Sequence, residues 1–379
     1  MPAYFGDNRF KFGLFGCNCA GGMTLSSAPE RWRAEWDEID AVYRLADAAG
    51  IEFLLPIAKW HGLGGDADTW GRSYETFTHS AAAGAITRHI GVFVTAHVPI
   101  ITPAFAAKAI TTIDHVTHGR VGLNIVCGWN PDEFGLHGVV IDGQRRYDQG
   151  MEWYRVYAKM LEGGAPFDFK GEFYDLVNVA TNPLPLQKPR PPIMSAGSSG
   201  TGRQFAAIAA DMLFTAIPDL EQAPRIVREV KSDAKSHGRE TDVFIQTQMV
   251  CRPTRQEAED YYYYFAEEHA DRDALAYFRK QRGTTLSKNA TVADVPYFHA
   301  PKTRFTLATG KNYSGIFPGT YSLVGTPDDI VAELLKLSAT GISGSTLIFL
   351  NYLTEMPYFV QEVLPRMERA GLRRPFANA

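Results

Sequence analysis

Short apolar runs alternate along the chain with longer segments whose apolar residues recur every three or four positions. The short runs have the length of buried strands, and the longer segments have the period of amphipathic helices. The apolar runs predict strands at residues 10–18, 52–60, 90–99, 120–130, 191–199, 211–219, 242–252 and 345–352. The periodic segments predict helices at residues 35–50, 73–87, 103–119, 145–163, 201–210, 221–238, 254–281, 326–341 and 356–371. Strand and helix are therefore expected to alternate throughout the chain.

Residues with strong conformational preferences support several of these helix boundaries. Gly50 is a C-cap signal at the end of the first predicted helix. Pro103 suits the first turn of the helix at 103–119, and Thr326 is an N-cap residue for the helix at 326–341.

Eight strand–helix alternations with apolar strands predict a single α/β domain over residues 1–379, folded as a (β/α)8 TIM barrel. Two segments interrupt the alternation and are expected to be insertions. Residues 167–190 open with a run that alternates around Lys170-Gly171 and predicts a β-hairpin, while residues 282–318 are polar, aperiodic and lid-like. A doubly wound open sheet is the competing architecture. Its dinucleotide site would need a Gly-x-Gly-x-x-Gly turn, which the first strand lacks.

The amino-acid composition limits the classes of molecule that the protein is expected to bind. The 379 residues are 45% hydrophobic and 21% charged, with a net charge of −4 and no basic stripe, which argues against a nucleic-acid partner. No uninterrupted apolar run reaches the length of a membrane span, and residues 1–7 lack the pattern of a secretion signal. We therefore expect a cytoplasmic protein without a membrane partner.

The four cysteines point to a reducing compartment. Cys17 and Cys19 are two apart, and Cys127 and Cys251 stand alone, so the spacing of a zinc site does not occur. Cys127 and Cys251 lie in apolar strand patterns and are expected to be buried, inert thiols. No metal is expected.

The predicted strands end in polar, aromatic or glycine-rich residues, which packing alone does not require. In a TIM barrel the active site lies at these carboxyl ends. The first five ends read Gly16-Cys17-Asn18, Ala58-Lys59-Trp60-His61, Thr95-Ala96-His97, Gly128-Trp129-Asn130 and Gly197-Ser198-Ser199-Gly200.

Asn124 is a polar residue in the middle of the apolar fourth strand, RVGLNIV. Burying an amide without a hydrogen-bond partner costs roughly 1–3 kcal/mol on mutational scales. A specific partner for Asn124 is therefore expected.

The fifth strand end predicts an anion site. Small residues before a helix leave backbone N–H groups directed at one point, where the helix dipole favours negative charge. Ser198, Ser199, Gly200 and Thr201 would form this phosphate site, with Arg203 one turn into the helix. A tight turn with a serine N-cap explains the same residues equally well.

Six segments together resemble the bacterial-luciferase-like, two-component flavin monooxygenases. They are AKWHGLGG (58–65), TTIDHVTHGRVGLNIVCGWNPDEFG (111–135), RRYD (145–148), FKGEFY (169–174), PIMSAGSSGTG (192–202) and LVGTPDDIVAELLKL (323–337). Within this family the chain looks closest to the branch of the Rut pyrimidine monooxygenases, with dimethylsulfone and alkanesulfonate monooxygenases further off. The resemblance runs from about residue 10 to residue 370.

The resemblance implies a (β/α)8 barrel that uses O2 and reduced FMN, which a separate NAD(P)H-dependent flavin reductase delivers. It also implies a homodimer or homotetramer. Carried over by motif, Arg146, Tyr147 and Ser199 with its neighbouring backbone (Ser198, Gly200) would hold the FMN phosphate. Ala58, Lys59, Asn124 and Glu133 match residues that contact the isoalloxazine and ribityl portions.

Thr95 and Asn124 match the residues that shape the oxygen pocket beside flavin nitrogen-5 in the pyrimidine-monooxygenase branch. The resemblance thus offers a partner for the buried Asn124 amide, namely the flavin or its oxygen adduct. A reactive flavin adduct needs a dry pocket with a few fixed hydrogen-bond donors. We expect both side chains to be donors and the reaction to use a nitrogen-5 peroxide that splits a carbon–heteroatom bond.

The residues at the expected substrate-binding positions differ from those of the relatives. Alkanesulfonate monooxygenases carry Arg and His on the seventh strand, where this chain has Gln246 and Gln248. Two amides suit a neutral, hydrogen-bonding substrate, although buried amides are usually satisfied internally and these two would then bond each other. The second strand carries Trp60-His61, which differs from the pyrimidine branch and argues against uracil itself.

Other strand-end side chains are candidates for substrate contact. His61 and His97 titrate near neutrality and can serve as acid–base groups or as structural hydrogen-bonders. Trp129 is expected to be a cavity wall or a core residue, and Glu133 a ribityl acceptor or a cap.

The sequence therefore predicts an FMN-dependent monooxygenase acting on a small neutral N-heterocycle. The alternatives are a sulfone or sulfonate monooxygenase, a riboflavin-degrading lyase of the same family, a deazaflavin-dependent oxidoreductase, and a non-catalytic flavin-binding paralogue.

Overall fold

The computed structural model describes residues 4, 6–140, 143, 145–197, 199–217, 220–284, 313 and 315–376. Eight parallel strands within these ranges close into a barrel, which confirms the predicted TIM-barrel fold and excludes the open sheet. They are β1 (Lys11–Phe15), β2 (Phe53–Leu55), β3 (Gly91–His97), β4 (Val121–Val126), β7 (Ile193–Ser195), β8 (Met212–Phe214), β9 (Asp242–Cys251) and β11 (Gly344–Ile348).

The barrel closes because the first and last strands pair. β1 pairs with β11 from Lys11↔Gly344 onward and with β2 from Gly13↔Phe53 onward. The other neighbours follow chain order, and β9 joins β8 to β11. Each predicted barrel strand is therefore present, usually shorter than its apolar run.

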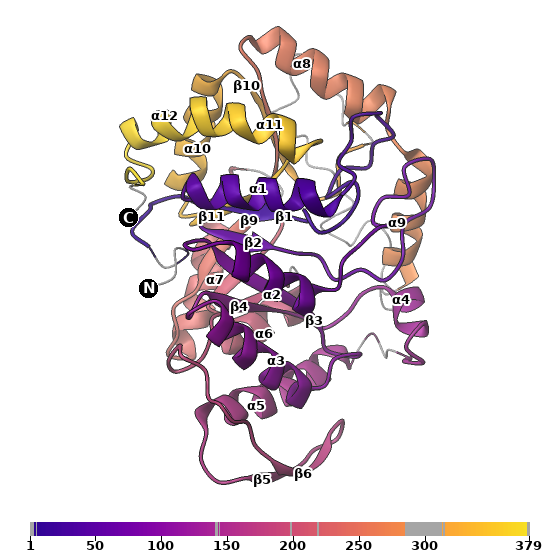
Figure 1. Cartoon of the computed structure of the whole chain (residues 1–379), viewed down its shortest axis with the longest axis vertical. Coiled ribbons are helices and arrows are strands. Elements are labelled where there is room, and N and C mark those ends of the chain that lie inside the picture. The colour runs from indigo at the N-terminus through magenta and orange to yellow at the C-terminus, as the bar shows by residue number, and fades with distance from the viewer. Residues whose placement is uncertain are drawn as a thin grey trace.

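Helices surround the barrel (Figure 1). Those before β9 are α1 (Trp36–Ala48), α2 (Thr76–Ile86), α3 (Pro103–Val116), α4 (Pro131–Gly135), α5 (Arg146–Glu162), α6 (Gly200–Ala209) and α7 (Ala223–Ser236). The predicted boundary signals are confirmed: Pro103 is in the first turn of α3, and Gly50 follows α1 with a φ of 70°. The short α4 was not anticipated, although Asn130 caps it by accepting from Asp132 N.

The predicted helix at 254–281 is divided. α8 (Arg255–Tyr263) begins with a capping box between Thr254 and Glu257, continues as the π-helix η2 (Tyr264–Glu268), and is separated from α9 (Arg272–Thr284). Most of the predicted lid, 282–318, lies outside the described residues.

A strand that the sequence did not reveal follows this segment. β10 (Tyr321–Gly325) pairs with the second half of β9, from Tyr321↔Thr247 to Gly325↔Cys251. β9 is ten residues long and extends beyond the barrel, so it has free backbone groups there for an added strand. Thr326 then caps α10 (Pro327–Ala339), as predicted.

The last helix begins earlier than its apolar spacing indicated. Asn351 accepts hydrogen bonds from Leu353 N and Thr354 N, so it ends the extended chain after β11 and starts α11 (Tyr352–Tyr358). The π-helix η4 (Phe359–Val363) and α12 (Leu364–Arg369) continue it. The predicted start at residue 356 is therefore wrong by one turn.

The hairpin insertion is confirmed. β5 (Phe167–Lys170) and β6 (Asp175–Val179) form a separate two-stranded antiparallel sheet. Figure 1 shows it projecting beyond α5, away from the barrel strands.

Aromatic rings fill the lower part of the barrel interior. Phe53 contacts Phe93 and Phe244 edge-on, with ring centroids 5.6 Å and 5.5 Å away. Glycines on neighbouring strands make room for the rings, because a methyl group at Gly13 would overlap Phe53 and one at Gly122 would overlap Phe93. Side chains two residues further along a strand point to the same side. Thr95 and Asn124 thus lie directly above this aromatic layer.

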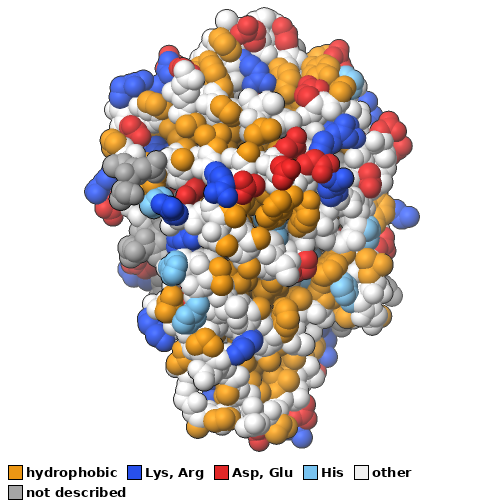
Figure 2. Space-filling view, viewed as in Figure 1, with side chains coloured by type: hydrophobic (Ala, Val, Ile, Leu, Met, Phe, Trp, Pro, Cys, Tyr) orange, Lys and Arg blue, Asp and Glu red, His pale blue; other side chains and the backbone are white. Residues whose placement is uncertain are grey.

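The surface and the cysteines agree with the composition. Figure 2 shows acidic and basic side chains interspersed over this face. All four cysteines are free and buried. None of the helices in the described ranges is long and apolar enough to cross a membrane.

His79 links stability to pH. Its ring is buried between α1 and α2, with Nε2 3.2 Å from the Tyr43 hydroxyl, and burial lowers its pKa from 6.5 to about 4. Between those values the unfolded chain binds a proton that the folded chain does not, so the stabilisation present above pH 6.5 is lost as the pH falls toward 4. We expect the unfolding free energy of His79→Phe, measured by urea titration, to fall less over this range than that of the parent. An identical pH slope in both proteins would contradict this.

Candidate active site

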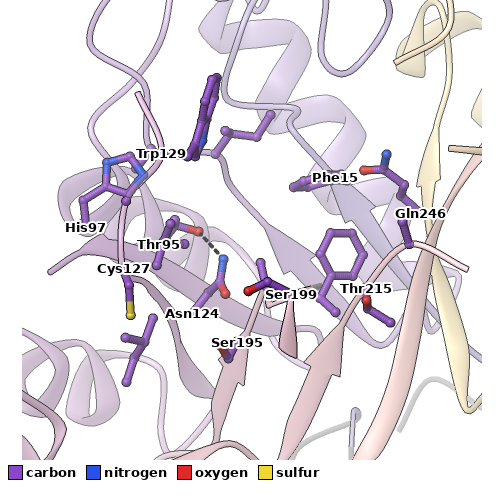
Figure 3. Close-up of a pocket in the computed structure, with 18 of the residues that line it drawn as sticks. Phe15, Thr95, His97, Asn124, Cys127, Trp129, Ser195, Ser199, Thr215 and Gln246 are labelled. Carbon is purple, nitrogen blue, oxygen red and sulfur yellow. Dashed lines mark hydrogen bonds between the residues drawn. The ribbon is translucent and has the colours of Figure 1, made fainter. Parts of the chain in front are cut away.

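A cavity of about 590 Å³ lies at the carboxyl ends of the barrel strands. Its size is that of a typical cofactor or ligand site. Figure 3 shows side chains from several strand ends converging on it. The strand-end residues that the sequence singled out therefore meet at one cavity. The chemical character of this cavity changes from one end to the other.

The centre of the cavity holds a fixed chain of hydrogen bonds. Thr95 Oγ1 donates to the carbonyl of Pro56 at 2.6 Å, and Asn124 Nδ2 donates to Thr95 Oγ1 at 3.1 Å (Figure 3). Thr95 and Asn124 are neighbours in register on β3 and β4, and both are 5% exposed. The buried Asn124 amide therefore has a protein partner.

These two hydrogen bonds determine which atoms of Thr95 and Asn124 remain available to a ligand. A threonine hydroxyl has one proton, and here Pro56 receives it, so Asn124 must present its NH2 group to Thr95. Asn124 Oδ1 is left buried without a partner among the described residues. The expectation that both side chains donate into the pocket is therefore corrected: Thr95 positions Asn124, and Asn124 Oδ1 offers an acceptor.

One end of the cavity suits an anion. Ser199 caps α6, accepting from Gly202 N at 3.1 Å, and Gly200 begins the helix. Arg146 and Arg203 line the same end, and the Nε atoms of both are buried without a partner among the described residues. A helix N-terminus with two guanidinium groups can bind a phosphate through charge-assisted hydrogen bonds.

Two glycines keep this anion end compact. A side chain on Gly197 would overlap the backbone of Gly202, and one on Gly202 would approach the Tyr147 hydroxyl. The loop after β7 therefore lies directly against the first turn of α6 and the start of α5. Ser198 lies outside the described residues, so its predicted role stays a prediction.

Lys59 is held in a buried ion pair. Its Nζ is 3.1 Å from Glu133 Oε2, and the two side chains are 2% and 0% exposed. The ammonium also lies over the rings of Trp70 and Trp129, 4.4 Å and 4.3 Å from their centroids. Glu133 Oε1 accepts from Trp60 N at 3.2 Å. The pair is neutral overall, and Glu133 lies behind Lys59 and does not line the cavity.

Aromatic side chains form the wall beyond Lys59. Trp70 contacts Phe317, Phe317 contacts Phe278, and Phe278 contacts Trp129, with centroids 4.4–5.3 Å apart. α9 brings Phe278 to this wall and is tied to α4, because Tyr277 donates to Asp132 at 2.8 Å. Figure 1 shows α9 and α4 on the same flank.

Neutral polar groups face the aromatic wall from the other strands. Gln246 on β9 donates to Thr320 Oγ1 at 2.8 Å, and Thr215 after β8 has a buried hydroxyl without a partner among the described residues. No carboxylate is found among the described residues that line the cavity.

His97 and Cys127 add neutral groups to the wall. Burial lowers the pKa of His97 to about 4, so the imidazole is neutral at physiological pH. Burial raises the pKa of the Cys127 thiol to about 12, which agrees with the predicted inert cysteine.

Most of the predicted site residues line this one cavity. They are Ala58, Lys59, Thr95, His97, Asn124, Trp129, Arg146, Tyr147, Ser199, Gly200 and Gln246. Trp60 and His61 do not, since the ring of Trp60 packs on His137 and His61 Nδ1 lies 2.8 Å from Gly62 O. Gln248 accepts from Thr24 Oγ1, so the two glutamines have different partners.

Several lining residues were missed from the sequence. Phe15 and Thr215 directly follow or end strands, so the same rule applied to every strand end would have found them. Phe278 and Phe317 come from α9 and from the segment before β10, where no periodic pattern points to the barrel mouth.

Comparison with known proteins gives a consistent assignment. The family model described as luciferase-like monooxygenase matches residues 10–344. A pyrimidine monooxygenase RutA from Allorhizobium ampelinum is 28% identical over 367 residues, covering 94% of this chain and 96% of the relative. An FMNH2-dependent dimethylsulfone monooxygenase from Pseudomonas putida is 28% identical over 373 residues, covering 97% and 98%.

Solved structures share the fold. A riboflavin lyase with modified FMN and riboflavin superposes with a TM-score of 0.81 at 18% identity, covering 98% of this chain and 94% of the other. A long-chain alkane monooxygenase gives 0.81 at 19% identity, with coverage of 98% and 93%. DmoA from Hyphomicrobium sulfonivorans gives 0.80 at 19% identity, with coverage of 98% and 90%.

The Lys59–Glu133 pair yields a stability prediction. Lys59→Met leaves a buried carboxylate unpaired, so we expect it to lower the unfolding free energy by about 3–5 kcal/mol. Adding Glu133→Gln removes the charge and keeps an acceptor for Trp60 N, so the double variant should recover much of the loss. Arg225→Met, in an exposed pair with Glu229, is the control and should change stability by less than about 1 kcal/mol. Equal small effects at both sites in urea titrations would refute the buried-pair account.

Proposed function

The chain belongs to the luciferase-like monooxygenase family, and from this premise we propose that it uses reduced FMN and O2 to oxygenate a small neutral heterocycle. The proposed reaction cleaves a carbon–heteroatom bond. A separate NAD(P)H-dependent flavin reductase supplies the reduced FMN. A homodimer or homotetramer remains the expected assembly.

The observation that carries the proposal is the buried acceptor at Asn124 Oδ1 on the same cavity as an anion site. A ligand that fits must donate a hydrogen bond near its middle and carry a phosphate at one end. Reduced FMN satisfies both requirements, because its flavin ring carries N–H groups and its ribityl chain ends in a phosphate. The residues present therefore fit the cofactor.

The chain's own residues have distinct parts in this proposal. Ser199, Gly200, Arg146 and Arg203 hold the phosphate, Tyr147 packs beside them, and Ala58 and Asn124 contact the ring. Reduced FMN, when bound, would supply the activation of O2, for which we propose its nitrogen-5, and Asn124 would hold the ring. Thr95 holds the Asn124 amide in one orientation, so no reorganisation is needed when charge develops. The aromatic wall excludes water.

The distribution of charge supports a neutral substrate. Cationic groups line the cavity at the anion end and at Lys59, and the Lys59 charge is balanced by Glu133. Beyond them the wall offers aromatic rings with Gln246 and Thr215. A flat ring that both stacks and hydrogen-bonds suits this end, whereas a sulfonate would find no unbalanced cation there among the described residues.

Reconstitution tests the proposal. The purified chain is combined with FMN, a flavin reductase, NADH and isotopically labelled O2, and candidate N-heterocycles, sulfones and riboflavin are screened by mass spectrometry. We expect labelled oxygen in the product of a neutral N-heterocycle. Hydride transfer without O2 consumption, or oxygenation of sulfones alone, would overturn the proposed function.

Asn124→Leu tests the role of the buried acceptor Asn124 Oδ1 in the proposed reaction. Because it removes the acceptor and retains the side-chain volume, we expect product formation at saturating FMN to fall about 100-fold, as for loss of one fixed polar group in an active site. Gln256→Leu, an exposed amide on α8, is the control and should leave turnover unchanged. Full activity of Asn124→Leu would remove Asn124 from the mechanism.

Arg203→Met tests the phosphate end separately. Loss of one charge-assisted hydrogen bond should weaken FMN binding roughly ten-fold or more. Riboflavin lacks the phosphate, so its affinity should not change in a parallel fluorescence titration. Arg228→Met, on the exposed face of α7, should affect neither ligand. An equal loss for FMN and riboflavin would show that Arg203 does not read the phosphate.

A further inference from the structure

A second, much smaller cavity lies beside the main one, between the first turn of α2 and the loop that follows β3. Its volume is about 10 Å³. That is room for roughly one water or one diatomic molecule. Phe77 from α2 and Ile100 and Ile101 from the loop are among the residues that line it.

The two cavities share one thin wall. Ala58, Lys59, Thr95 and His97 line both of them. Figure 3 places Thr95 and His97 on the side of the main cavity opposite Phe15 and Gln246. The small cavity thus reaches Thr95, the hydrogen-bond partner of Asn124, from the side opposite Phe15 and Gln246.

The polar groups around the small cavity are largely engaged with protein. Glu75 accepts from Phe77 N and Thr78 N, and Thr76 Oγ1 donates to Thr95 O at 2.7 Å. Among the buried side-chain atoms of its described lining residues, His97 Nδ1 alone lacks a partner. A buried water needs two to four polar partners, so this space favours a small apolar molecule.

Its outer end approaches the surface. Ile100 and Ile101 are half-buried, and Trp60, which also lines the cavity, is 39% exposed. The small cavity, which we call the passage, therefore lies between the partly exposed side chains of Trp60, Ile100 and Ile101 and the wall formed by Thr95.

We propose that this passage is the route by which O2 reaches the reaction centre. The inference rests on the proposed function, because it needs an enzyme that consumes O2. When FMN and substrate fill the main cavity, they block the mouth of the barrel to further ligands. O2 is small and apolar, so it can pass Phe77, Ile100 and Ile101 and arrive beside Thr95 and Asn124 while both ligands stay in place.

The passage can be narrowed without touching the main cavity. Ile100 and Ile101 do not line the main cavity, so Ile100→Trp adds bulk to the passage alone. Enzyme loaded anaerobically with reduced FMN and substrate is mixed with graded O2 in a stopped-flow spectrometer. We expect the second-order rate constant for O2 to fall about ten-fold, with the affinities for FMN and substrate unchanged. The milder Ile101→Phe should give an intermediate decrease.

Ile208→Trp is the matched control, because Ile208 lies on the exposed side of α6. Its rate constant for O2 should equal that of the parent. If the parent consumes O2 and neither passage variant slows it, the route is refuted while the proposed function stands. If the parent does not consume O2 with any substrate, the proposed function itself fails.

Discussion

The site depends on the sealed floor of the barrel. Phe53, Phe93 and Phe244 fill the interior below the cavity, and the alternation of side chains along β3 and β4 then places Thr95 and Asn124 one layer above them. A polar atom in this position has rings beneath it and no water from below, so every hydrogen bond it lacks is costly. The floor therefore leaves Asn124 Oδ1 as a buried acceptor that a ligand can satisfy.

The cavity above this floor is graded along its length. Arg146, Arg203 and the start of α6 make one end cationic, the Thr95–Asn124 pair makes the centre neutral and polar, and the far wall is aromatic. A ligand with an anionic group at one end and a flat ring at the other can bind in this cavity in one orientation only. Lys59 does not disturb the gradient, because Glu133 balances its charge where neither side chain meets solvent. The orientation of a bound ligand is thus set by the cationic groups at one end of the cavity and by the neutralisation of Lys59 by Glu133.

The sequence predicted the barrel because its strands are apolar runs of the right length, separated by periodic helices. The rule about strand ends located one part of the cavity wall, including Lys59, Thr95 and Trp129, and the family resemblance added Arg146 and Tyr147. The sequence could not show that Trp60 and His61 lie away from the cavity, since β2 ends at Leu55 and the course of the loop after it depends on its contacts. Nor could it reveal β10, whose pairing depends on β9 extending beyond the barrel, or the direction of the Thr95 hydroxyl, which Pro56 determines. These features arise from contacts between residues distant along the chain.

The burial of every cysteine has a practical consequence for studying this protein. The four thiols are buried, and burial raises the pKa of Cys127, the one at the cavity wall, so the folded chain should react slowly with maleimide or iodoacetamide dyes. One cysteine introduced on α9 and another on α4 would therefore carry a donor and an acceptor fluorophore with little competing labelling. The distance between the two helices that flank the aromatic wall then becomes an optical signal that can be followed as ligands enter and leave.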